Sequence, residues 1–257
     1  ITSGVYQEDL AITKNGVSLY GLGYVLIQSA TATDTITIQG DVNSIPRFLS
    51  LNGIHIMNSN AAQSCIRLIG AASSEVGNIN IVLNDCELIA SGAASYPLRA
   101  ASVNRLYMRG GSMRMSSADA FCLIEEVAHF NLYGVSDITA LQLDYDNAGT
   151  LPVTVSSKYE INNCTLNANS TVVNSISSNL SGAGSLEVSN VQTLLGVSLD
   201  GDRSFNFANC KMGNITSSNA STTITLKDCQ RGSLSGLGTV AENVFKGSLT
   251  FTNSSVE

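Results

Sequence analysis

The sequence predicts an all-β fold, a single-stranded right-handed parallel β-helix (a solenoid) with little helix. Three observations predict it. Short runs in which apolar and polar residues alternate occur along the whole chain. Many of these runs share one template, in which apolar–x–apolar–polar is followed by Asn or Asp and then by Cys or another small residue. The template recurs at irregular intervals of about 25 residues, which indicates coils of fixed cross-section joined by loops of variable length.

The template defines a series of equivalent turn positions. The segments that fit it closely are 78–88, 157–166, 184–194, 203–212, 222–232 and 247–256. Segments 49–56, 106–113 and 130–137 fit more loosely, with Gly in the turn, and the second of these leaves the register open by one residue. The predicted turn residues are Gly53, Asp85, Gly111, Gly134, Asn163, Asn190, Asn209, Asp228 and Asn253.

The residue types at these turns have a physical reason. Asn, Asp and Gly tolerate left-handed backbone dihedrals, so they allow a sharp bend between two strands. We expect the Asn side chains to hydrogen-bond along the stack. The residue after the turn points inward, where the bend leaves little room, and four cysteines occupy this place: Cys86, Cys164, Cys210 and Cys229. We expect buried, reduced thiols there, with no disulfide and no metal or other cofactor.

A second set of strands lies between the turn segments. Its members are residues 65–70, 96–102, 120–127, 151–157 and 171–178. One coil therefore holds two or three short strands, and about ten coils spaced by about 4.8 Å predict a rod about 50 Å long. We expect one domain over residues 1–257, with N-terminal coils in 1–60, central coils in 61–150 and C-terminal coils in 151–257.

Composition excludes several functional classes. Apolar residues make up 44% of the chain and charged residues only 13%, with a net charge of −7. No basic run is present, which argues against nucleic-acid binding. No run of 18 apolar residues is present, which argues against membrane insertion. A polar surface built from Ser, Thr, Asn and Gly favours an extracellular or virion-surface location.

The first 28 residues resemble the opening coils of pectin-lyase-like β-helix proteins. The matching elements are Gly4-Val5-Tyr6, Glu8-Asp9-Leu10, Lys14-Asn15-Gly16-Val17 and Gly21-x-Gly23. The resemblance implies the β-helix fold and says little about function, because this fold hosts lyases, hydrolases, esterases and inert spikes. The motifs of the family's esterases, polygalacturonases and pectate lyases are not found, so by analogy the catalytic set is missing.

Two groups of residues are candidates for binding. Alternation places Arg67, Arg99 and Glu125 on successive copies of one strand, facing solvent, where they could bind an acidic sugar or form a surface ion-pair ladder. Asp144 and Asp146 are expected in a loop, where a loose calcium site is the alternative to an Asx-rich turn. His55 and His129 have no partner in a recognisable motif, so we expect solvated or strand-edge histidines.

These observations favour a structural virion or cell-surface protein, such as a phage or viral tail spike, fibre or capsid decoration, without enzymatic activity. Both ends stop within a coil, and an uncapped sheet end needs a cover. We therefore expect other virion or surface proteins as partners, a homotrimer as the assembly, and a host glycan as a candidate ligand. The alternatives are a polysaccharide-active enzyme (a pectin or uronide lyase, hydrolase or esterase) and a bacterial adhesin.

Overall fold

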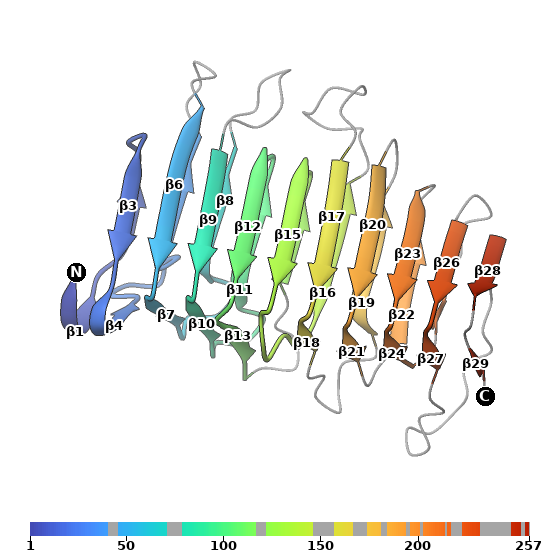
Figure 1. The fold of residues 1–257 in the computed structure, drawn as a ribbon. Coiled ribbons are helices and arrows are strands. Elements are labelled where there is room, and N and C mark those ends of the chain that lie inside the picture. Colours follow the sequence, from blue (N-terminus) through green and yellow to red (C-terminus); the bar gives the residue numbers. More distant parts are fainter. Residues whose placement is uncertain are drawn as a thin grey trace.

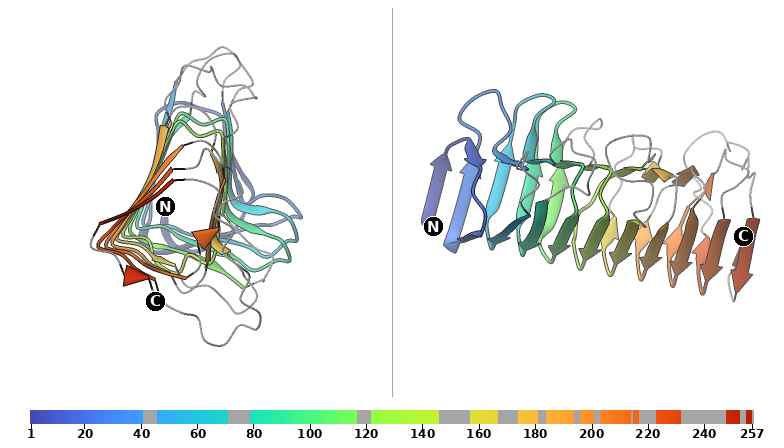
Figure 2. Two further views of the ribbon diagram at one scale, coloured as in Figure 1. Left: turned by 90° about the vertical axis from the view of Figure 1, so that its right-hand side faces the viewer. Right: turned by 90° about the horizontal axis from the view of Figure 1, so that it is seen from above.

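Parallel strands stack along one axis to form a rod, with the two termini at its opposite ends (Figure 1). The computed structural model describes residues 1–40, 46–70, 79–116, 122–145, 157–166, 174–180, 184–193, 196–200, 203–213, 215–216, 223–231, 248–252 and 255–256. These residues form strands and turns and contain no helix. The expected all-β class is therefore confirmed, and the long parallel sheets are consistent with a β-helix solenoid. Seen along the axis, successive coils superpose (Figure 2).

Two long sheets form most of the wall. The ten-stranded sheet contains β3 (Val17–Tyr20), β6 (Arg47–Asn52), β9 (Ile79–Asn84), β12 (Arg105–Arg109), β15 (His129–Tyr133), β17 (Ser157–Asn162), β20 (Gly184–Ser189), β23 (Ser204–Ala208), β26 (Thr223–Lys227) and β28 (Ser248–Thr252). The nine-stranded sheet contains β2 (Leu10–Ile12), β5 (Ile36–Gln39), β8 (Ser64–Ile69), β11 (Tyr96–Ala101), β14 (Cys122–Glu125), β16 (Leu141–Tyr145), β19 (Asn174–Leu180), β22 (Gly196–Asp200) and β25 (Ile215–Thr216).

Two five-stranded sheets complete the wall. The first contains β1 (Thr2–Gln7), β4 (Leu22–Gln28), β7 (His55–Asn58), β10 (Glu87–Ala90) and β13 (Ser112–Met115). The second contains β18 (Thr165–Leu166), β21 (Gln192–Thr193), β24 (Lys211–Met212), β27 (Gln230–Arg231) and β29 (Ser255–Val256). The isolated bridges Ser112–Ser136 and Ile138–Leu166 link the two sheets. Each typical coil thus runs from the ten-stranded sheet through a short strand to the nine-stranded sheet.

Alternate residues of every wall point into one apolar core that runs from Ile12 to Cys229 among the described residues. On the ten-stranded sheet one inward-facing row is Leu19, Leu51, Leu83, Met108, Leu132, Ile161, Val188, Phe207 and Leu226. Burying one such side chain stabilises the fold by about 1.5–3 kcal/mol relative to exposure. Because each row repeats along the rod, the core holds neighbouring coils in register.

The turn after the ten-stranded sheet repeats at the same place in successive coils. Five of its residues have φ between 49° and 54°, in the left-handed region: Asp85, Asn163, Asn190, Asn209 and Asp228. The Asn190 N–H donates to the carbonyl of Ala208 at 3.0 Å, and the Asn209 N–H donates to the carbonyl of Lys227 at 2.9 Å. The Asn209 side-chain amide also donates to Oδ1 of Asn190 at 2.7 Å. These residues therefore lie in single file, whereas Asn253 lies outside the described residues.

One turn position is corrected by a single residue. The sequence template placed Gly111 at the turn, but Arg109 pairs with Asn84 and with Tyr133, so Gly110 is the residue in line with Asp85. The Gly110 N–H donates to the carbonyl of Tyr133 at 2.8 Å. This is the same bond to the strand of the next coil that the turn residues Asn190 and Asn209 make. Gly111 instead takes the small inward position, where an added Cβ would lie 2.0 Å from the carbonyl oxygen of Cys86. Two consecutive glycines made the register ambiguous in the sequence.

All six cysteines are free and buried. In the turn series, the Cys86 thiol donates to the carbonyl of Leu51 at 3.3 Å and the Cys229 thiol donates to the carbonyl of Phe207 at 3.4 Å. Burial raises the pKa of Cys65 to about 12 and that of Cys86 to about 11. The Cys65 and Cys86 thiols therefore stay protonated at neutral pH and behave as small core residues.

Replacing Asn209 with Val should lower the free energy of unfolding by about 1–2 kcal/mol, because a β-branched residue is strained at positive φ and the hydrogen bond to Asn190 is lost. Asn209→Gly should cost less than about 1 kcal/mol, because Gly keeps the backbone conformation and loses only the exposed amide contact. Denaturant unfolding of both variants measures the difference. Equal losses would contradict a left-handed turn at this residue.

Stability should fall as the pH rises above 9, the ordinary thiol pKa, because the pKa of Cys65 is raised in the folded state. The unfolded chain then loses its proton first, so the contribution is complete below pH 9 and decreases through higher pH. Between pH 7.5 and pH 10 the native protein should lose about 1.4 kcal/mol more than Cys65→Ala. Unfolding free energies at both pH values test this, and parallel losses in the two proteins would refute it.

Candidate functional site on the nine-stranded sheet

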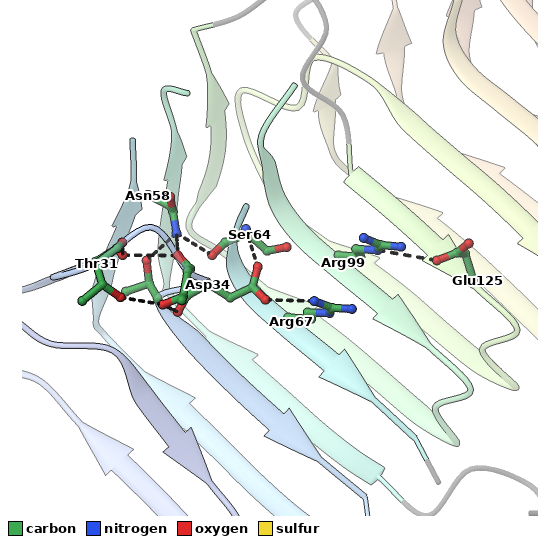
Figure 3. A network of polar contacts seen from close by, with 10 residues as sticks. Thr31, Asp34, Asn58, Ser64, Arg67, Arg99 and Glu125 are labelled. Atoms are coloured by element: carbon green, nitrogen blue, oxygen red, sulfur yellow. Dashed lines mark hydrogen bonds and ion pairs between the residues drawn. The ribbon is translucent and has the colours of Figure 1, made fainter. Parts of the chain in front are cut away.

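The two arginines selected from the sequence are neighbours on the outer face of the nine-stranded sheet. Arg99 on β11 pairs directly with Arg67 on β8, so the two side chains leave adjacent strands at the same level (Figure 3). Their side chains are 39% exposed for Arg67 and 34% exposed for Arg99. Two cations on adjacent strands repel each other, and each has a carboxylate partner.

Asp34, from the preceding coil, binds Arg67. Arg67 Nη1 lies 3.3 Å from Oδ2 of Asp34, and the Ser64 N–H donates to Oδ1 of Asp34 at 2.7 Å. Asp34 is only 9% exposed. Because the backbone bond is the shorter and more buried one, the main role of Asp34 is to fix the start of β8.

The buried side-chain amide of Asn58 holds the backbone around Asp34 and Ser64 in place. Asn58 is fully buried, and its Nδ2 donates to the carbonyls of Thr33 at 2.8 Å and Ser64 at 3.0 Å, and to Oγ1 of Thr35 at 3.1 Å. Its Oδ1 accepts from the Asn60 N–H at 2.8 Å. A buried amide with all these bonds made stabilises one loop conformation, and removing it would leave several groups unpaired. The part of the network in Figure 3 that surrounds Asn58 therefore serves to hold the loop in place.

Asp9 organises the loop that leads to Asp34. Its Oδ1 accepts from the Ser29 hydroxyl at 2.8 Å and the Ala30 N–H at 3.0 Å, and its Oδ2 accepts from the Thr31 hydroxyl at 2.5 Å. Burial alone would raise the pKa of Asp9, but the hydrogen bonds from Thr31, Ser29 and Ala30 outweigh it and hold the pKa below its ordinary value. Asp9 is thus a loop anchor that stays ionised.

Glu125 contacts Arg99 from β14, the next strand of the sheet, but does not lie directly opposite it. Leu123, not Glu125, pairs with Arg99, and Glu125 pairs with Ala101. The two positions are two residues apart, so Glu125 still faces outward and its Oε2 lies 3.7 Å from Nε of Arg99. Arg67, Arg99 and Glu125 therefore lie on successive strands of one sheet and face outward, with Glu125 displaced by two residues along its strand. The Arg99 guanidinium also lies 5.4 Å from the centre of the Tyr96 ring.

Asp144 lies in a strand, which corrects the expected loop. It belongs to β16, where Leu141 and Leu143 point into the core and are 1% and 0% exposed. Asp144 pairs directly with Glu125, so it extends the charged strip by one coil. The sequence predicts the strand of this coil in residues 151–157, whereas the structure has it at 141–145, and residues 151–156 lie outside the described ones. Asp146 lies outside them as well.

A second polar cluster, on the first five-stranded sheet, was missed. His55 Nδ1 lies 2.5 Å from Oε2 of Glu87, and Oε1 of Glu87 lies 3.1 Å from Nε of Arg114. The same Arg114 nitrogen is 3.5 Å from Oδ2 of Asp137. The Tyr24 ring lies beside His55 with a centroid separation of 4.7 Å. His55 is the first residue of β7 and its side chain is 30% exposed, so it lies at a strand edge as expected and also has a carboxylate partner.

The sequence held a signal for this pairing. His55 follows the turn residue Gly53 by two positions, and Glu87 follows Asp85 by two positions, so the shared turn register alone brings them together. Searching for histidine motifs along the chain could not find a contact between residues 32 positions apart. Offsets measured from the repeated turn would have found it.

The chemistry of these clusters is mutual neutralisation. In both, each cation has a carboxylate partner, and surface pairs of this kind contribute about 0–1 kcal/mol each. Within the described part of the chain, no group of three or more His, Cys, Asp and Glu side chains is placed to hold a metal ion. The same part of the chain has no helix with the length and apolarity needed to cross a bilayer.

Comparison with known proteins gives no match: no family model, no curated protein and no solved structure is similar to this chain at a significant level.

Replacing Asp34 with Ala should lower the free energy of unfolding by about 1–3 kcal/mol, because the Ser64 N–H then loses its buried acceptor. Arg67→Ala should cost less than about 1 kcal/mol, because the guanidinium is partly exposed and screened. Asp34→Asn keeps an acceptor without the charge and should fall between them. Unfolding curves of the three variants give the order, and a larger loss for Arg67→Ala would contradict it.

Proposed function

We propose that this chain is a structural surface protein, a scaffold whose outer faces are displayed at a virion or cell surface. In this proposal it is one right-handed β-helix domain of about ten coils, related to the pectin-lyase-like proteins that its first residues resemble. The right hand is favoured because parallel crossover connections are right-handed in about 98% of cases. The ten-stranded sheet supports the number of coils.

The observation that carries the proposal is the unbroken core. One set of inward rows passes through every described coil, so the chain uses its apolar residues to build a stiff rod. One outward row on the later strands of the ten-stranded sheet is small and uncharged, namely Ser185, Ser204 and Thr223. A stiff rod with such a surface suits a spike, fibre or decoration protein that must remain folded outside the cell.

An enzymatic role has weaker support. Arg67, Arg99 and Glu125 face solvent on the nine-stranded sheet, but they are engaged in ion pairs with neighbouring side chains. General acid–base catalysis on a sugar needs two carboxyl groups on either side of a bond, whereas Glu125 and Asp144 are directly stacked on adjacent strands. The strip Arg67–Arg99–Glu125–Asp144 therefore supports a role in recognition more than one in bond cleavage.

The purified protein should release neither reducing ends nor unsaturated uronides from pectin, polygalacturonate or alginate. Antibody labelling in the source organism should find it at the surface of virus particles, with which it should copurify. Labelling of the cell envelope without particles would favour the adhesin. A polysaccharide-cleaving activity that Arg99→Ala abolishes would overturn the scaffold proposal in favour of the enzyme.

A further inference from the structure

A groove lies on the outer face of the ten-stranded sheet, over strands β3, β6, β9 and β12. These four strands stand side by side near the N-terminal end of the sheet (Figure 1). Its volume is about 390 Å³. The lining comes from Gly16, Ser18, Phe48, Leu49, Ser50, Asn80, Ile81, Val82, Arg105 and Tyr107. This groove lies on a different sheet from the arginine strip and the His55 cluster.

Two aromatic side chains flank the groove. Phe48 on β6 is 58% exposed, although a large apolar side chain normally avoids water. Tyr107 on β12 is two strands away, because Ser50 pairs with Val82 and Val82 pairs with Tyr107. Adjacent strands are about 4.8 Å apart, and Phe48 lies two residues before Ser50 along its strand, so the two aromatic side chains leave the sheet about 12 Å apart. The small outward residues between them create the hollow.

The polar groups in the lining are few, and most of them have their hydrogen bonds made within the protein. The Asn80 amide donates to the carbonyl of Arg47 at 3.4 Å, and Oδ1 of Asn80 accepts from Asn104 at 2.8 Å. The Ser50 hydroxyl donates to Oγ of Ser18 at 2.9 Å. Among the described residues the hydroxyl hydrogen of Ser18 has no acceptor, and Ser18 is exposed. Ser18 therefore offers a donor to a ligand in the groove.

Arg105 is the one charged side chain in the lining, and it is exposed. In the described structure no carboxylate lies within ion-pair distance of its guanidinium. Along the same row, Lys158 is neutralised by Glu160 at 2.7 Å and by Glu187 at 3.8 Å. Burial, followed by the nearby Arg105, lowers the pKa of His129, so His129 is uncharged at neutral pH. In a chain of net charge −7, this groove presents a local positive charge.

We propose that the groove binds a carboxylate-bearing sugar unit of a glycan, with Arg105 pairing with the carboxylate. The apolar C–H face of the ring packs on Phe48 or Tyr107, and a ring hydroxyl accepts from Ser18. Sites for small ligands combine an apolar lining with a few placed polar groups in this way. A phosphate polymer would need several cations, whereas the lining supplies one. The proposal does not depend on whether the chain is a virion component.

Isothermal titration calorimetry at low and physiological salt tests the site. The probes are short oligosaccharides of galacturonate, glucuronate and alginate uronates, and sialyllactose, each beside its methyl ester. At least one acidic probe should bind, and its methyl ester should bind at least about tenfold more weakly, because the charge-assisted bond to Arg105 is lost. Added salt should weaken the acidic probe more than the ester.

Matched variants locate the binding. Arg105→Ala and Phe48→Ala should each weaken it about tenfold or more. Arg109→Ala, at the other end of β12, and Tyr133→Ala, which removes an aromatic side chain that is 53% exposed, lie outside the lining and should leave it unchanged. Unchanged melting temperatures show that all four variants fold. Failure of every acidic probe, equal binding of the esters, or equal effects of the groove and control variants would overturn the proposal.

Discussion

The whole molecule depends on a bend that recurs at the same residue of successive coils and keeps a left-handed backbone conformation there. Its N–H donates to the carbonyl that ends the strand of the next coil, as from Asn190 to Ala208 and from Asn209 to Lys227. Because side chains alternate along a strand, a slip of one residue at this point would turn an inward row outward. The bend therefore fixes which residues reach the core and which reach solvent, and every polar cluster described above inherits its geometry from it.

The outer faces differ in how far their charges are satisfied. On the nine-stranded sheet Arg67 and Arg99 are paired with Asp34 and Glu125, and the pairs mainly hold strand ends together. On the ten-stranded sheet Arg105 and an exposed Phe48 line the same groove. An exposed aromatic ring and a cation that has no carboxylate nearby among the described residues contribute little to folding, so this is the face on which recognition of a ligand is the better explanation.

The features that could be predicted from the sequence are those that recur in every coil. Asn163, Asn190 and Asn209 could be placed because residue type, backbone conformation and inward neighbour all agree at those turns. Gly110 and Gly111 could not be ordered, since both tolerate the bend. Contacts between side chains of neighbouring coils were harder to predict. The pairing of His55 with Glu87 can be found only when the two coils are aligned, because the residues are far apart in the sequence.

The groove was the least predictable feature. It depends on the sizes of outward side chains on four strands from separate parts of the sequence, and no local pattern records their combination. Asp144 was misplaced for a related reason, because two runs competed for the same sheet and only one can pair with β14. The alternation of apolar and polar residues within a run therefore predicts single strands well. It predicts features formed by side chains of several strands much less well.

The tight approach at Gly110 limits how such a rod can evolve. A Cβ there would lie 2.1 Å from Oδ1 of Asp85, so the Asn that other coils carry at this turn would fit only if the Asp85 carboxylate moved. Neighbouring coils are thus fitted to each other as specific pairs, although their backbones look alike. Duplicating or shuffling whole coils would bring mismatched partners together, so lengthening of the rod by recombination requires compensating substitutions on both sides of each new junction.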